Sequence, residues 1–125
     1  MYRIKSVIAT LLAVLLCMGS FAMAEGAAAG YQLGGKIGDF TVTTFDGKTV
    51  TLSEVLKEKE MVLINIWATW CGPCRNEFPF MEEAYKQYAD DVAIIALSCE
   101  PTDTDERLAE FAAEMGMTFY VARDT

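Results

Sequence analysis

The stretch Trp67-Ala68-Thr69-Trp70-Cys71-Gly72-Pro73-Cys74-Arg75 decides the fold of this chain. It follows a nearly continuous apolar run, Met61–Trp67, which is typical of a strand that is covered on both faces of a parallel sheet. The apolar residues that recur at helical spacing after it are Phe78, Met81, Tyr85 and Tyr88. We therefore expect a strand that leads into a helix from Cys71 to about Tyr88, with two cysteines at the junction.

The two cysteines at this junction suit thiol–disulfide exchange. Cys71 would lie in the first turn of the helix, where unpaired backbone N–H groups and the positive end of the helix dipole stabilise an anion. Such surroundings lower the pKa of a cysteine, and the thiolate is the nucleophile in exchange. Cys74 follows one turn later on the same face, close enough to form a disulfide with Cys71. Gly72 leaves room for an incoming disulfide, and Pro73 has no N–H to lose in a first turn.

The same cysteine spacing occurs in zinc sites and in structural disulfides. A zinc site would need further ligands, and the chain has no histidine and only Cys17 and Cys99 besides the pair. A structural disulfide across so short a loop would constrain the unfolded chain very little. We therefore favour redox chemistry, with the Cys71–Cys74 disulfide as the redox group and neither metal nor other cofactor. For Cys99 we favour a small buried residue over an extra resolving or regulatory thiol.

The N-terminus has the pattern of a secretory signal peptide. A basic start, Met1–Lys5, is followed by an apolar segment and by a small-x-small cleavage signature that ends at Ala24. An uncleaved membrane anchor and a lipidated Cys17 are the alternatives to cleavage. The expected segments are a signal peptide (1–24), a flexible linker (25–36) and a folded domain (37–125). We therefore expect a periplasmic or otherwise extracytoplasmic protein.

The charge of the mature chain is strongly negative. Without residues 1–24, 8 lysines and arginines remain against 18 acidic residues, which gives a net charge of −10. Such a surface argues against nucleic acids and anionic membranes as partners.

In an oxidising compartment, a Cys-x-x-Cys pair indicates a maintained redox function, not a scaffold stapled by disulfides.

The other segments complete an α/β pattern. The elements expected, in order, are strands at 39–44 and 49–51 around an Asp46-Gly47 turn, a short helix that Ser53 caps, the strand and helix around the cysteines, a strand at 92–98, a helix that Asp103 and Glu106 open and Gly116 ends, and a strand at 118–121. Alternating strands and helices predict a parallel sheet, and such sheets place their sites at the carboxyl ends of strands, where Cys71 lies.

The motif Trp70-Cys71-Gly72-Pro73-Cys74 after an apolar strand resembles the thioredoxin superfamily, in particular its exported TlpA/ResA-like thiol–disulfide oxidoreductases. The likeness extends to 38–41 (Gly-Asp-Phe-Thr), 65–70 (Asn-Ile-Trp-Ala-Thr-Trp) and 75–79 (Arg-Asn-Glu-Phe-Pro). It implies a thioredoxin-like α/β fold, in which an N-terminal β-hairpin accompanies central parallel strands flanked by helices. It also implies that the chain is truncated before the cis-proline loop, so we expect a fragment of a longer gene product.

The resemblance also implies roles for individual residues. Cys71 would attack the disulfide of a partner protein, and Cys74 would resolve the mixed disulfide. Cytosolic thioredoxins have a buried aspartate where Asn65 stands, and an amide cannot accept the proton that this step releases. ResA-like members have a glutamate where Glu77 stands, so Glu77 is the candidate proton acceptor, with a solvated helix residue as the alternative.

The partner-docking surface implied by the resemblance contains Trp70, Gly72 and Pro73, although Trp70 would serve equally to pack against the strand. The implied function is an exported enzyme that reduces protein disulfides, for example the haem-site cysteines of apocytochromes c, with electrons from a membrane partner. A peroxiredoxin-type peroxidase is disfavoured because Ala68 stands three residues before Cys71, where those enzymes have a hydroxyl residue. A truncated, non-catalytic module that binds partners or acts like a chaperone through exposed sheet surface is the third alternative.

Overall fold

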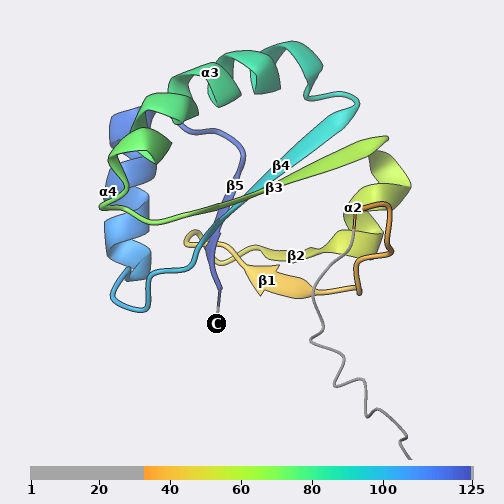
Figure 1. The fold of residues 1–125 in the computed structure, drawn as a ribbon, viewed down its shortest axis with the longest axis horizontal. Coiled ribbons are helices and arrows are strands. Elements are labelled where there is room, and N and C mark those ends of the chain that lie inside the picture. The colour runs from red at the N-terminus through yellow and green to blue at the C-terminus, as the bar shows by residue number, and fades with distance from the viewer. Residues whose placement is uncertain (1–32, 125) are drawn as a thin grey trace, which may run out of the picture. The chain divides into compact units, whose positions relative to one another are not determined.

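The computed structural model describes residues 33–124, in which strands and helices alternate as predicted (Figure 1). The elements are β1 (Thr41–Thr43), β2 (Thr49–Thr51), α2 (Leu52–Glu58), β3 (Met61–Trp67), α3 (Gly72–Tyr88), β4 (Val92–Ser98), α4 (Asp105–Met115) and β5 (Tyr120–Arg123). The predicted signal peptide, the lipidation alternative at Cys17 and most of the linker lie outside these residues. Across residues 33–124, no helix has the length and apolar character needed to span a membrane.

The strands form a hairpin and a parallel sheet. β1 and β2 pair antiparallel, and Gly47 takes a positive φ of 84° in the turn between them. The parallel sheet has the order β3-β4-β5, with Trp67 at the end of β3 opposite Ser98 at the end of β4. A bridge between Thr44 and Ala122 connects the hairpin to β5. This arrangement confirms the predicted thioredoxin-like fold class.

The central strand β4 separates two hydrophobic cores. Ile94 and Ala96 belong to the core under α3 and α4, whereas Ile95 and Leu97 belong to the core on the side of the hairpin and α2 (Figure 1). The first core consists of Trp67, Phe78, Met81, Ile94, Ala96, Leu108, Phe111, Ala112, Phe119 and Val121. Because both faces of β4 are covered, its continuous apolar sequence is explained.

The burial of β3 differs from the prediction. Within the described residues β3 is an edge strand, since β4 is its one partner in the sheet. Met61, Leu63 and Ile66 are 57%, 41% and 58% exposed. The apolar run predicts a strand here correctly, but the expectation that both faces are covered is wrong for β3. An edge strand also presents unpaired backbone N–H and C=O groups.

The helix α3 buries a narrower stripe than predicted. Phe78 and Met81 are buried and Tyr85 is half-buried, but Tyr88 is 51% exposed. Tyr88 is the last helical residue, and its carbonyl accepts a hydrogen bond from the N–H of Asp91, where the chain turns into β4. Its inclusion in the buried stripe was therefore wrong.

The start of α2 does not use the predicted cap. Ser53 lies inside the helix, and Thr51 is the N-cap residue. The N–H and hydroxyl of Ser53 instead donate to the carboxylate of Asp39, at 2.9 and 2.7 Å. The first turn of α2 is thus satisfied by an acid from the segment before β1.

The start of α4 is also shifted. Thr104, not Asp103, is the N-cap residue, and its hydroxyl accepts a hydrogen bond from the N–H of Arg107 at 3.3 Å. Gly116 ends α4 in the left-handed region, with φ 66°, as predicted. Asp103 is therefore available for a different role, at the edge of the sheet where the cysteines lie.

Candidate redox site

The two cysteines lie where β3 ends and α3 begins. They form a disulfide, with their Cα atoms 5.3 Å apart. Cys71 is the N-cap residue of α3, one position before the first turn in which it was predicted, and its Sγ accepts a hydrogen bond from the N–H of Cys74 at 3.3 Å. In the reduced state the same N–H and the helix dipole would stabilise a thiolate on Cys71.

A short turn leads into the disulfide, whose two cysteines are half-buried. The N–H of Cys71 donates to the carbonyl of Ala68 at 3.0 Å, and the N–H of Arg75 donates to the carbonyl of Cys71 at 3.1 Å. Gly72 and Pro73 are exposed in the first turn of α3. A Cβ added at Gly72 would meet nothing within 4 Å, so the packing of this chain does not itself require a glycine there. The roles of Gly72 and Pro73 in docking stay predictions.

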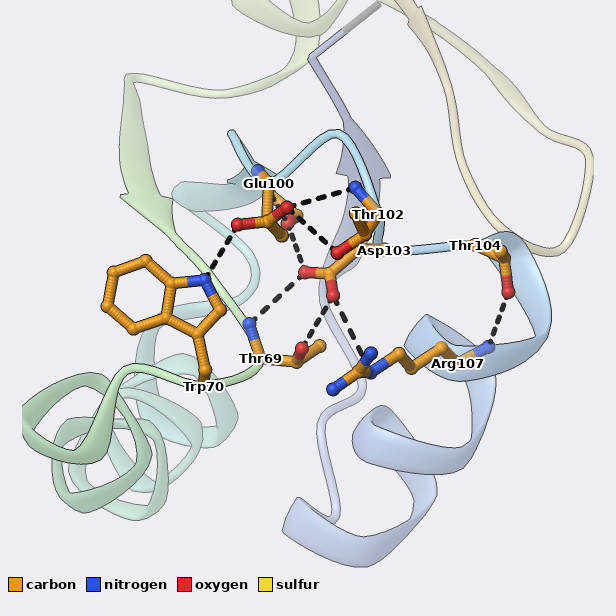
Figure 2. Close-up of polar contacts among 8 residues, drawn as sticks. Thr69, Trp70, Glu100, Thr102, Asp103, Thr104 and Arg107 are labelled. Carbon is orange, nitrogen blue, oxygen red and sulfur yellow. Dashed lines mark hydrogen bonds and ion pairs between the residues drawn. The ribbon is translucent and has the colours of Figure 1, made fainter.

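The indole of Trp70 projects beside this turn. Trp70 is 68% exposed, which does not agree with the alternative that it packs against the strand. Its Nε1–H donates to Oε2 of Glu100 at 2.8 Å (Figure 2). This hydrogen bond, followed by those from the hydroxyl and N–H of Thr102, holds the pKa of Glu100 below its usual range. Glu100 carries no sequence signal that singles it out.

Asp103 lies in the loop between β4 and α4, where the sequence predicts a helix cap. Its side chain is fully buried and accepts hydrogen bonds from the N–H of Thr69 at 3.1 Å and the hydroxyl of Thr69 at 2.5 Å (Figure 2). It also accepts a hydrogen bond from the hydroxyl of Ser98 at 2.5 Å. Nε of Arg107 lies 3.6 Å from the carboxylate. Burial acts to raise the pKa of Asp103, but the hydrogen bonds from Ser98 and Thr69 outweigh it and leave the pKa lowered.

The two residues considered for proton transfer lie on different elements. Glu77 is exposed on α3, three residues after Cys74, a spacing that makes side chains neighbours on a helix surface. Its role as proton acceptor stays a prediction. Asn65 lies in β3, and its Oδ1 is buried with no hydrogen-bond partner among the described residues.

Cys99 is exposed, so the expectation of a small buried residue is wrong. It follows the last residue of β4, beyond the ladder that pairs Trp67 with Ser98. Its N–H and its Sγ both approach the carbonyl of Trp67, at 2.9 and 3.3 Å. Cys99 thus lies, as an exposed residue, at the same carboxyl edge of the sheet as the disulfide.

The first turns of α3 are fixed against the sheet and against α4. The ring of Trp67 packs against Phe78 and Phe111, with centroids 4.8 and 4.7 Å apart. The guanidinium of Arg75 lies 4.8 Å from the centroid of the Phe111 ring and forms an ion pair with Glu114. The aromatic cluster and this cation therefore anchor the helix that carries the disulfide.

A hairpin, a parallel sheet and a Cys-x-x-Cys disulfide at a strand–helix junction define a thioredoxin-like redox domain. Sequence comparison agrees with this class, because the model described as the AhpC/TSA family matches residues 33–125. The chain belongs to the AhpC/TSA family.

Individual relatives carry names from the same class. The chain is similar to the thioredoxin-like protein YneN of Bacillus subtilis, with 38% identity over 96 residues that cover 76% of this chain and 55% of YneN. It is 40% identical over 94 residues to the thiol-disulfide oxidoreductase ResA of Bacillus anthracis, which covers 74% of this chain and 52% of ResA. The chain thus spans about half the length of the curated relatives that it matches. The predicted ResA-like resemblance is confirmed.

Solved structures show the same fold. The solution structure of a putative protein disulfide isomerase from Bacteroides thetaiotaomicron superposes with a TM-score of 0.62 at 35% identity, over 74% of this chain and 58% of that one.

Proposed function

We propose that the chain catalyses thiol–disulfide exchange through Cys71 and Cys74. The observation that carries this proposal is the Cys71–Cys74 disulfide at the N-terminus of α3, in which the Cys71 sulfur accepts the N–H of Cys74. The helix end stabilises a thiolate on Cys71. Cys74, on the same turn, is placed to attack a mixed disulfide at Cys71 and release the partner protein. The name of the ResA relatives, thiol-disulfide oxidoreductase, supports the same chemistry.

The reaction proceeds in two displacements. The Cys71 thiolate attacks one sulfur of a partner disulfide, which forms a mixed disulfide and releases the other partner sulfur as a thiolate. Cys74 then loses its proton, to Glu77 in our proposal, and attacks the Cys71 sulfur. This step closes the Cys71–Cys74 disulfide and releases the second partner sulfur. The partner disulfide is reduced by two electrons, and the enzyme dithiol is oxidised.

We further propose that the protein works outside the cytoplasm and in the reducing direction. The signal-like N-terminus supports export, and the likeness to ResA supports protein disulfides as substrates, with haem-site cysteines of apocytochromes c as an example. An exported reductant needs a supply of electrons, for which a membrane donor is the proposed source. The reduction potential of the Cys71–Cys74 pair tests the direction: a value of about −120 mV, as in DsbA, would refute it.

The activity is tested by reduction of a disulfide-bonded protein such as insulin, with dithiothreitol as electron source. Cys71→Ser should abolish the rate above the uncatalysed background, because the attacking sulfur is lost. Cys99→Ser is the matched control, since it removes an exposed thiol at the same edge of the sheet and should leave the rate unchanged. Equal rates for the full chain and Cys71→Ser would refute the proposal.

Two measurements separate the alternatives. A peroxidase of the peroxiredoxin type is disfavoured by the buried Ala68, which offers no hydroxyl three residues before Cys71. Peroxide turnover as fast as disulfide exchange would reverse that judgement. A non-catalytic binding module would use the exposed apolar residues of β3, and its function in cells would survive Cys71→Ser.

A further inference from the structure

One buried carboxylate holds together three parts of the chain around the disulfide. Asp103 has no exposed surface, and its oxygens accept hydrogen bonds from the turn after β3, through Thr69, and from the end of β4, through Ser98. Arg107 of α4 supplies a partial counter-charge at 3.6 Å. Figure 2 shows Thr69 and Arg107 approaching the carboxylate of Asp103 from separate elements.

The contact with Thr69 is the one that reaches the disulfide. Thr69 lies inside the turn that the hydrogen bond from the Cys71 N–H to the Ala68 carbonyl closes. Both its N–H and its hydroxyl donate to Asp103, so the peptide unit and the side chain are fixed together. The Cα atoms of Thr69 and Cys71 are at most ~7 Å apart, because two residues of extended chain span no more. A rotation of Thr69 would therefore move Cys71 relative to α3.

The position of the Cys71 sulfur matters for its reactivity. Its hydrogen bond from the Cys74 N–H is 3.3 Å long, and the favourable field of a helix end falls off within one turn. Movement of Cys71 away from this point would weaken the stabilisation of its thiolate. A fixed turn is thus a condition for a reactive thiol, beyond its contribution to stability.

We propose that Asp103 is a positioning residue for the redox site, which holds Thr69 and thereby keeps the Cys71 sulfur at the N-terminus of α3. This inference rests on the proposed function, since it concerns the reactivity of the same sulfur. Ser98 contacts the same carboxylate from the end of β4 and does not belong to the turn. The hydroxyl of Ser98 also accepts a hydrogen bond from the N–H of Glu100 at 3.3 Å. The chain therefore offers two contacts to the same carboxylate, one inside the turn before Cys71 and one outside it.

The test compares Thr69→Val with Ser98→Ala in the full, reduced chain. Each variant removes one hydroxyl donor that lies 2.5 Å from Asp103 and leaves the carboxylate in place. Asp103→Asn is less informative, because loss of a charge near Glu100, Arg107 and the helix end would also favour the Cys71 thiolate. Cys99 is replaced by serine throughout, so that alkylation by iodoacetamide reports on the remaining pair. The rate at Cys71 is followed against pH by mass spectrometry.

Thr69→Val should raise the apparent pKa of Cys71 by about half a unit, which lowers the thiolate fraction roughly threefold at pH values well below that pKa. Ser98→Ala should leave the pKa unchanged while lowering the urea midpoint to a similar extent. Equal pKa values in the two variants, or a Cys71 as slow as free cysteine before substitution, would overturn the inference. A reactive Cys71 in a chain that fails to reduce insulin would instead refute the proposed function alone.

Discussion

Replacement of Phe78 by alanine should remove much of the stability of the fold. Phe78 is fully buried, with its ring centroid 4.8 Å from that of Trp67 and 5.7 Å from that of Phe111. Truncation of a core phenylalanine costs about 3–5 kcal/mol, and loss of two edge-on aromatic contacts places the value in the upper part of that range. Small domains are stable by only about 5–15 kcal/mol, so the change is large.

Urea denaturation of the oxidised chain, followed by circular dichroism, measures the effect. Phe80→Ala is the matched control, because Phe80 lies two residues later on the same helix and is 73% exposed. It should change the free energy of unfolding by no more than about 0.5 kcal/mol. Phe78→Leu adds an intermediate point at about 1–2 kcal/mol. A loss at Phe78→Ala below about 1 kcal/mol, or equal to that at Phe80→Ala, would refute the packing of α3 on the sheet.

Three further predictions concern the redox site. Cys74→Ser should accumulate a mixed disulfide between Cys71 and the partner, visible by mass spectrometry without reductant; a chain that releases its partner would contradict the resolving role. Glu77→Gln should slow the second displacement by about 10²-fold or more and leave the urea midpoint unchanged. An unaltered rate would contradict the role as proton acceptor and favour the alternative that Glu77 is a solvated helix residue. Asp103 has a pKa held below its unfolded value of about 3.9, so its stabilisation is present above that pH and is lost as the pH falls through the folded pKa. Asp103→Asn should therefore flatten the acid side of a plot of urea midpoint against pH, and an identical acid limb would contradict this.

The order of elements follows from local sequence patterns. The apolar run predicts the strand β3. The cysteine pair, with Pro73 between its members, and the apolar residues at helical spacing after it predict the helix α3. Gly47 and Gly116 mark a turn and a helix end because both adopt positive φ angles. These features depend on neighbours in the sequence, which is why they can be predicted from the sequence.

Burial was predicted less well because it depends on distant partners. β3 and β4 are both apolar runs, yet β4 lies between two strands and β3 at an edge of the described sheet. Cys99 follows an apolar strand directly but lies past its last paired residue, so it is exposed. Sequence patterns give the character of each strand, whereas the order of strands in the sheet decides what covers it.

The role of Asp103 illustrates a second limit. Asp103 and Thr104 are adjacent residues that both serve well as helix caps, and only one of them can take the position. Thr104 caps α4, which frees the carboxylate of Asp103 to meet donors on the turn after β3, 34 positions earlier in the chain. No local pattern contains that pairing, because the sheet brings the two loops together.

The loop after β4 therefore takes part in shaping the redox site. Two successive residues before Cys71 are each held by an acid from this loop, Thr69 by Asp103 on the buried side and Trp70 by Glu100 on the exposed side. The buried contact fixes the turn, and the exposed contact fixes the direction of the indole. A Cys-Gly-Pro-Cys motif alone specifies neither of these two contacts, because both acids lie in the loop between β4 and α4. Differences in this loop among otherwise similar domains would thus change the surroundings of an identical motif.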